Sequence, residues 1–432
     1  MGTDGSQVML GIKTFTISYS INVVLVILLE EYYQSEYGRP FLWNSYAPGY
    51  DATSLIQYAR GIIKNSSVGV HDDLKFHIVG IAIARDWING SDDSGVLLKQ
   101  FSYVGYPWLV GGIMYVANFF GDMSALAPRM VNCMFGGLLV VSILALAAST
   151  YGLTVGKRAV AISITLPLIG FYSANTFRDI IVAFFVVVST LLINRLSKPS
   201  SAFAKSGNAS SLIVCGTALL LLRSPTLYTL LAAYALYFSM FGGGLLKRMS
   251  VGLLLLGLLV ALIVNVEAFS NQTLDYLSKQ GESWNESRIM GGTKESLAIK
   301  YIYNTPPYVS IPMSTIYMIF MPVPPFNSLS LPGLLEGISA LTWYFFVPFW
   351  IFGLWSGVKN REVALVAITC IVLFLSVAYV GGALRHKIPF MVLGFIHVSY
   401  ALEVLWVKKN AICLGTLLML LVSAGVYGVL KF

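Results

Sequence analysis

The chain has 432 residues, and its 28 Lys and Arg against 20 Asp and Glu give a net charge of +8. Only 11% of the residues are charged and 56% are hydrophobic, whereas a soluble domain carries about 25% charged residues. These proportions exclude a soluble enzyme and a disordered protein, and they are typical of an α-helical protein with several membrane spans. A transmembrane β-barrel is disfavoured, because the apolar runs are continuous instead of alternating with polar residues.

The pattern of apolar runs predicts an all-α polytopic membrane protein of about eleven transmembrane helices, which form a single membrane domain over residues 1–432. No cleavable signal peptide and no internal repeat is apparent in the sequence. The predicted spans are 11–30, 128–150, 159–175, 180–194, 209–222, 225–241, 249–268, 338–357, 363–382, 388–406 and 411–430.

Short basic loops set the predicted orientation, because cytoplasmic loops of membrane proteins are enriched in Lys and Arg. With the N-terminus in the cytoplasm, all five such loops fall on the cytoplasmic side if 103–120 does not cross the membrane. We therefore expect 103–120 to lie in the interface or to re-enter the membrane, and 309–326 to be a non-crossing or paired segment. The segment 209–241 is then a hairpin with its tip at 223–225, where Pro225 favours a turn. The basic loops are Lys157-Arg158, Arg195 to Lys198 with Lys205, Lys247-Arg248, Lys359 with Arg361, and Lys408-Lys409.

This topology predicts two large extracytosolic loops, at 31–127 with juxtamembrane helices and at 269–337. The stretch Leu196–Ser211 is rich in Ser, Ala, Lys and Gly and is predicted to be a flexible cytoplasmic loop. The four cysteines lie inside apolar segments without metal-type spacing, so they are interpreted as small buried side chains. They are Cys133, Cys215, Cys370 and Cys413.

Several charged residues fall on the predicted outer face, where they run against the usual charge bias. Each alone has a structural explanation, as a local ion pair, an interfacial anchor or a contact with lipid headgroups. Together they would line one cavity at the membrane surface, and arginine suits phosphate because its planar fork binds two oxygens. We therefore expect a site for a lipid phosphate built from Asp51, Arg129, Arg178, Asp179, Arg223, Arg385, His386 and Lys387.

Four sequence features resemble the GT-C glycosyltransferases, including protein O-mannosyltransferases and aminoarabinose transferases. Two of them are Pro48-Gly49-Tyr50-Asp51 after the first span, and Tyr106-Pro107-Trp108 followed by an apolar helix and Arg129. The others are Phe177-Arg178-Asp179 and Arg385-His386-Lys387-Ile388-Pro389. The proline-rich run 320–326 also resembles O-antigen and exopolysaccharide polymerases.

The resemblance implies an enzyme that takes a sugar from a polyprenyl-phosphate or polyprenyl-diphosphate donor. Asp51 would be the general base, and Asp179 a second carboxylate that orients the acceptor or shares a metal with Asp51. The basic residues would stabilise charge on the phosphate, and Arg288 in the second loop would help to hold an acceptor glycan. No cofactor is certain, and a divalent cation such as Mg²⁺ or Mn²⁺ stays open because Ala52 replaces an acidic residue common in the family.

The expected partners are the lipid-linked sugar donor, a lipid-linked or envelope glycan acceptor and membrane lipids, with no nucleic acid. The resemblance places the protein in the bacterial inner membrane, with its active site facing the periplasm. One alternative is a polymerase that joins lipid-linked repeat units. A second is a polysaccharide or lipid transporter or flippase, which would usually show internal repeats and broken midplane helices. A structural membrane subunit is the third.

Overall fold

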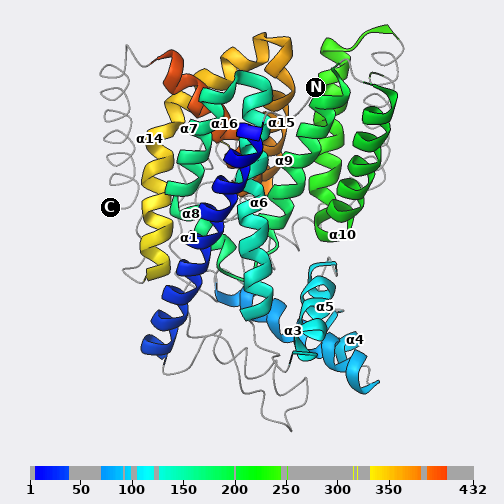
Figure 1. Ribbon diagram of the computed structural model, residues 1–432, viewed down its shortest axis with the longest axis vertical. Coiled ribbons are helices and arrows are strands. Elements are labelled where there is room, and N and C mark those ends of the chain that lie inside the picture. The colour runs from blue at the N-terminus through cyan, green and yellow to red at the C-terminus, as the bar shows by residue number, and fades with distance from the viewer. Residues whose placement is uncertain are drawn as a thin grey trace, which may run out of the picture.

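The computed structural model describes residues 5–37, 70–90, 93–98, 105–120, 126–198, 201–244, 331–380 and 387–405, with the single residues 251, 315 and 319. This part of the chain folds into helices joined by short turns and contains no strand, which confirms the all-helical prediction (Figure 1). The helices are α1 Gly5–Tyr37, α3 Val70–Asn89, α4 Asp93–Leu98, α5 Gly105–Asn118, α6 Leu126–Tyr151, α7 Leu153–Thr165, α8 Pro167–Ser173, α9 Asp179–Leu196, α10 Ala202–Phe241, α14 Leu331–Lys359, α15 Arg361–Val380 and α16 Ile388–Val404.

Five of these helices are long and apolar enough to cross a membrane, namely α1, α6, α9, α10 and α14, and the bent pair of α7 and α8 makes a possible sixth. Helices α15 and α16 lie over the predicted spans 363–382 and 388–406. The predicted spans 249–268 and 411–430 lie outside the described residues, apart from residue 251. The chain is therefore an α-helical membrane protein, while the count of eleven spans stays a prediction.

The span predicted at 159–175 is not one continuous helix, because the chain is broken there into α7 and α8, whose axes differ by 61°. Leu166 between them has extended backbone angles, and Pro167 opens α8. Proline lacks the N–H that would continue the hydrogen-bond ladder and its ring clashes with the preceding turn, so it begins a new helix.

Helix α10 is divided at Arg223, whose backbone angles (φ −163°, ψ 80°) are not helical. A Cβ placed on Gly216 would lie 3.9 Å from Leu227 Cδ1, although eleven residues of continuous helix would separate the two by about 16 Å. The chain therefore folds back at Arg223, at the tip expected for the hairpin.

Two predicted loop boundaries need correction. Leu196–Ser211 is not a loop throughout, because α9 ends at Leu196 and α10 already begins at Ala202. The Ser201 side chain accepts a hydrogen bond from the Ala204 amide, which caps the start of α10. Likewise, α14 begins at Leu331, inside the loop predicted for 269–337.

Helix α16 is largely buried and packs against α14, α7, α9 and α15. Glycines allow its closest contacts: a Cβ on Gly353 of α14 would collide with the His397 carbonyl, and a Cβ on Gly394 would lie 3.1 Å from the Trp350 ring. Small residues permit such close approach in membrane helices. Cys133, Cys215 and Cys370 are buried as expected, and Cys413 lies outside the described residues.

Helices α3, α4 and α5 lie beyond one end of the bundle, at the bottom of Figure 1. Helix α3 packs along α5, with Gly80 of α3 against Val110 and Gly111 of α5 against Ile83. Residues 105–120 thus lie beyond the end of the long helices, and the interfacial or re-entrant position of 103–120 stays a prediction.

Candidate functional site

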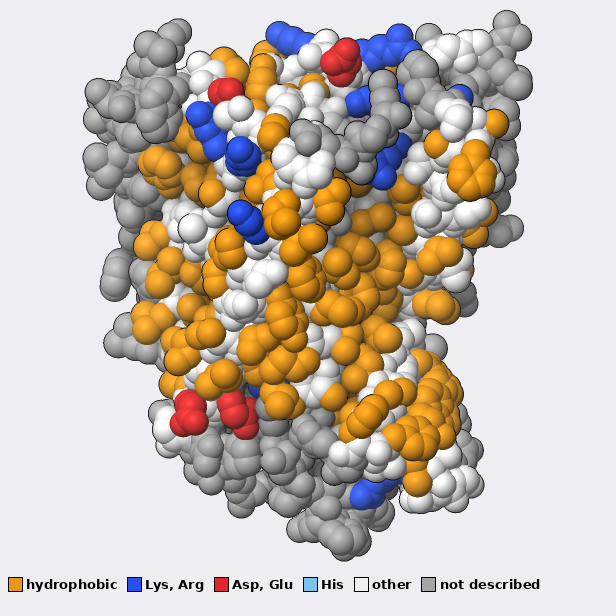
Figure 2. All heavy atoms as spheres, viewed as in Figure 1, with side chains coloured by type: hydrophobic (Ala, Val, Ile, Leu, Met, Phe, Trp, Pro, Cys, Tyr) orange, Lys and Arg blue, Asp and Glu red, His pale blue; other side chains and the backbone are white. Residues whose placement is uncertain are grey.

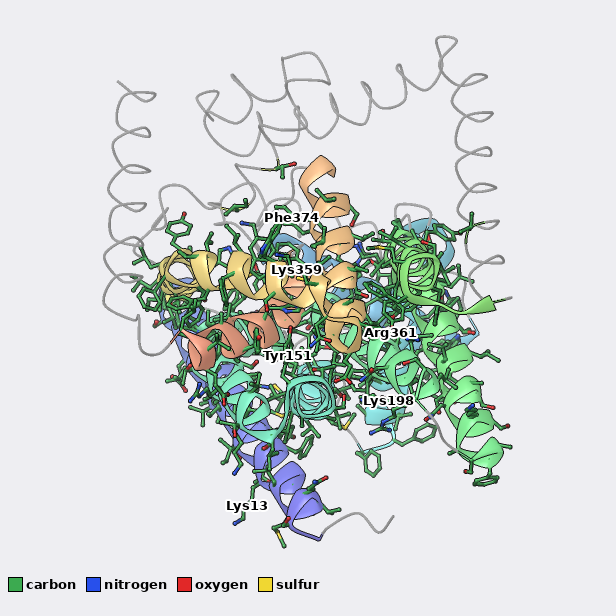
Figure 3. All side chains as sticks on the ribbon, turned by 90° about the horizontal axis from the view of Figure 1, so that it is seen from above. Lys13, Tyr151, Lys198, Lys359, Arg361 and Phe374 are labelled. Carbon is green, nitrogen blue, oxygen red and sulfur yellow. The ribbon has the colours of Figure 1, made fainter. Side chains whose placement is uncertain are left out.

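The two ends of the bundle differ in their charged residues. In Figure 2, most of the blue side chains on the visible face lie at the upper end. Three of the basic residues predicted to be cytoplasmic, Lys198, Lys359 and Arg361, are labelled in the view from above in Figure 3, and they come from the end of α9, the end of α14 and the start of α15. The described residues among those predicted for the outer face lie where α6, α9 and α16 begin and where α10 turns, at the opposite end.

Arg223 and Asp179 form an ion pair at the turn of α10. Arg223 Nη1 lies 3.2 Å from Asp179 Oδ1, and the two side chains retain only 16% and 6% of their exposure. Asp179 is the first residue of α9, where the positive end of the helix dipole favours a carboxylate. The backbone break at Arg223 and the start of α9 at Asp179 thus position both side chains of the ion pair.

Arg178 connects three elements beside this pair. Its backbone is the N-cap of α9, and its Nη1 donates a hydrogen bond of 3.4 Å to the Leu222 carbonyl at the α10 turn. Its guanidinium carbon also lies 5.9 Å from the centre of the Phe76 ring in α3, within the range of a cation–π contact. Arg178 therefore contacts both the bundle and the helices beneath it.

Arg129 is fully buried in the first turns of α6, and its Nη1 lies 3.6 Å from Glu30 Oε2 near the end of α1. His77 of α3 is also buried nearby. Burial, and then the positive charge of Arg129, lower the pKa of His77 to about 3, so its imidazole is neutral at physiological pH. Neither ring nitrogen of His77 has a hydrogen-bond partner among the described residues.

Asn132, one turn after Arg129, holds the chain that leads into Arg178 and Asp179. Its Nδ2 donates to the carbonyls of Asn175 at 2.6 Å and Phe177 at 3.0 Å, and its amide also contacts the Tyr106 hydroxyl of α5. A turn that ends one helix and starts another leaves backbone carbonyls without helical partners. Asn132 satisfies two of them and fixes the start of α9.

A cavity of about 90 Å³ opens beside the ion pair, between α10, α15 and the start of α16. One cationic group, three hydroxyls and four apolar side chains surround it. Its lining residues are Arg223, Pro225, Thr226, Thr229, Leu373, Ser376, Val377 and Pro389. Lys387 lies two residues before Pro389 and is fully buried, and this burial lowers the pKa of its amine to about 7.

The structure thus brings Arg129, Arg178, Asp179, Arg223 and Lys387 to one end of the bundle. Four further predicted site residues, Asp51, Arg288, Arg385 and His386, lie outside the described residues.

Three contributors to the site were not proposed from the sequence. Glu30 lies at the end of the first apolar run, on the same predicted side of the membrane as Arg129. This position is the sequence signal that could have identified Glu30 as part of the site. Nothing in the sequence marks His77 or Asn132 as part of the site.

The described residues do not fit a metal ion. No group of three His, Cys, Asp or Glu side chains within this part of the chain could hold one. The Arg223 guanidinium lies against Asp179, where it would repel a divalent cation. What the arrangement can do is bind an anion, since basic side chains from four elements lie at this end of the bundle.

The fold and the apolar helices define an α-helical integral membrane protein. No protein-family model matches the sequence, and no curated protein matches it either.

Proposed function

We propose that the protein is an integral-membrane glycosyltransferase. It transfers a sugar from a polyprenyl-phosphate or polyprenyl-diphosphate donor to an envelope glycan or a lipid-linked acceptor. The reaction takes place on the extracytosolic side, which in the bacterial cytoplasmic membrane is the periplasm. The observation that carries this proposal is the convergence of Arg129, Arg178, Arg223 and Lys387 at the end of the bundle opposite the basic loops.

The chemistry of such a transfer matches these residues. Negative charge grows on the donor phosphate as the sugar leaves, and fixed cationic groups away from water stabilise it. Arg223 lies at a cavity that also has apolar walls, which suits a phosphate attached to a hydrocarbon chain. Asp51 is assigned as the general base for the acceptor hydroxyl, a role that contributes roughly 10²–10⁴-fold to a rate.

In this proposal Asp179 has a role other than orienting the acceptor or sharing a metal. One of its carboxylate oxygens lies 3.2 Å from the Arg223 guanidinium, so this carboxylate is already engaged by a cationic group of the site. Asp179 is therefore assigned to hold Arg223 in position.

Binding of undecaprenyl phosphate to the purified protein in nanodiscs tests the site. Loss of one charge-assisted contact costs about 1.5–3 kcal/mol, so Arg223→Gln should weaken binding about tenfold or more. Lys205→Gln is the matched control, because Lys205 is an exposed residue near the start of α10. Asp51→Asn should keep binding and lose sugar transfer. Equal affinity of the Arg223 variant and the control would exclude this site.

A lipid or polysaccharide transporter is a second candidate, favoured by the broken helix at Leu166 and Pro167, since transporters often contain discontinuous spans. A flip assay with fluorescent lipid phosphate in liposomes separates the two. A transporter moves the probe between leaflets without adding sugar. A transferase adds sugar without moving the probe between leaflets. Within the transferase reading, a ladder of products instead of one added sugar would identify a polymerase.

A further inference from the structure

The contacts that hold Arg178 differ in kind from the ion pair that holds Arg223. Arg223 lies against the carboxylate of Asp179. The Arg178 guanidinium donates to the Leu222 carbonyl and lies 5.9 Å from the centre of the Phe76 ring in α3. A carbonyl and a ring carry no net charge, so these two contacts orient the guanidinium without neutralising it.

The packing of α3 on α5 fixes the Phe76 ring in place. One turn further along α3, on the same face of the helix, Gly80 lies so close to Val110 of α5 that no side chain would fit between them. The rings of Phe76 and Tyr106 meet edge to face, with centroids 4.8 Å apart and planes at 89°. Phe76 is 6% exposed and Tyr106 is 1% exposed. The ring beside Arg178 is therefore buried and held by α5 as well as by its own helix.

A second set of contacts joins α5 to the backbone of the same arginine. The Tyr106 hydroxyl lies 3.1 Å from Asn132 Nδ2. That nitrogen also donates to the carbonyls of Asn175 and Phe177, and Phe177 directly precedes Arg178 in the chain. The side chain and the backbone of Arg178 are thus both supported by the α3–α5 pair.

This support matters for the binding of an anion. A free arginine side chain has many rotamers, and the freedom that it loses when it holds a ligand weakens the affinity. An arginine that is already held in the binding orientation loses less. Because the Phe76 ring holds Arg178 without neutralising its charge, the contact favours the binding of a phosphate.

We propose that Phe76 is a positioning residue for the donor, whose ring holds the Arg178 guanidinium in the orientation that binds the lipid phosphate. This inference rests on the proposed function, and it assigns to α3 a part in recognising the donor. Loss of the ring should weaken the affinity for lipid phosphate about two- to tenfold, which corresponds to the cost of ordering one flexible side chain.

Binding of undecaprenyl phosphate to the full-length protein in nanodiscs tests the inference. Phe76→Leu removes the ring, whereas replacing Phe76 by trifluorophenylalanine nearly keeps its shape and withdraws negative charge from its face. Phe135→Leu is the matched control, because this half-buried ring of α6 contacts the rings of Phe184 and Phe185. Both changes at Phe76 are repeated in Arg178→Gln, and the resulting cycle measures the coupling between the two residues.

We expect both changes at Phe76 to weaken binding about two- to tenfold and to have no further effect in Arg178→Gln. The control should bind as the unaltered protein does. Unchanged affinity of the trifluorophenylalanine variant, or effects at Phe76 and Arg178 that simply add, would overturn the inference, because the ring would then act through packing alone.

Two outcomes separate this inference from the proposed function. If Arg178→Gln weakens binding and neither change at Phe76 does, the inference is wrong and the proposed function stands. If Arg178→Gln binds as tightly as the unaltered protein, Arg178 has no part in the donor site, and the inference fails together with that part of the proposed function.

Discussion

The ion pair between Asp179 and Arg223 provides the sharpest test of how the site is held together. Asp179→Asn keeps the shape of the side chain and removes the charge opposite Arg223. Removing one partner of a buried ion pair costs about 3–5 kcal/mol. Arg223 retains 16% of its side-chain exposure, so water partly solvates it and we expect the lower value, about 3 kcal/mol.

The expected change in melting temperature follows from the size of the chain. The unfolding entropy of globular proteins, about 2.1 cal/mol/K per residue, gives about 0.9 kcal/mol/K for 432 residues. A loss of about 3 kcal/mol then lowers Tm by about 3 °C at fixed scan rate in one detergent. Arg361→Gln, an exposed residue at the opposite end of the bundle, should change Tm by less than the measurement error.

A double-mutant cycle separates coupling from two independent losses. Arg223→Gln should destabilise the protein as Asp179→Asn does, and the double variant should be no less stable than the worse single variant. If the two decreases in Tm simply add, the residues do not interact and the ion pair has no part in fixing the α10 turn.

Three further predictions concern neighbouring features. Asn132→Leu should lose about 1–3 kcal/mol, because it removes the amide that satisfies the Asn175 and Phe177 carbonyls, and an unchanged Tm would contradict this role. Gly353→Ala should destabilise the α14–α16 contact by about 1–3 kcal/mol, because its Cβ meets the His397 carbonyl. Gly207→Ala, with nothing within 4 Å, should be neutral or stabilising in the same assay. His77 has a folded pKa of about 3, below its unfolded value, so acid favours the unfolded chain: stability should be constant above about pH 6.5 and fall by up to about 1.4 kcal/mol per pH unit between pH 6.5 and 3. His77→Gln should flatten that slope in Tm measured against pH.

The sequence was informative where local pattern decides the structure. Continuous apolar runs predicted the long helices, and the parity of the basic loops placed Arg129, Asp179 and Arg223 at one end, where the structure has them. The fold-back at residues 223–225 followed from the same parity, and Pro225 indicated a turn at its tip.

The sequence was uninformative where contacts join distant segments. Glu30 and Arg129 pair across two helices, and nothing local to either residue specifies the partner. The role of Asn132 is likewise not specified by its neighbours in sequence, since it depends on the turn at Asn175 lying beside the start of α6. The break before Pro167 had a signal in the sequence, because a proline lies within the predicted span. Hydropathy does not detect such a break, since the residues on both sides of it are apolar.

The environment of that break bears on the choice between transferase and transporter. In transporters, broken helices expose backbone groups to substrate or ions near the middle of the membrane, and the site is polar. Here Leu166 and Leu168 at the break are buried, and the Leu166 amide still donates to the Ile162 carbonyl. The described charged side chains that converge from separate elements, Arg129, Arg178 and Arg223, lie instead at one end of the bundle. The break is enclosed by apolar side chains, and it allows α8 to pack against α1, α6 and α14. A cationic site at one end of the bundle favours chemistry at the membrane surface over passage of a substrate through the bundle.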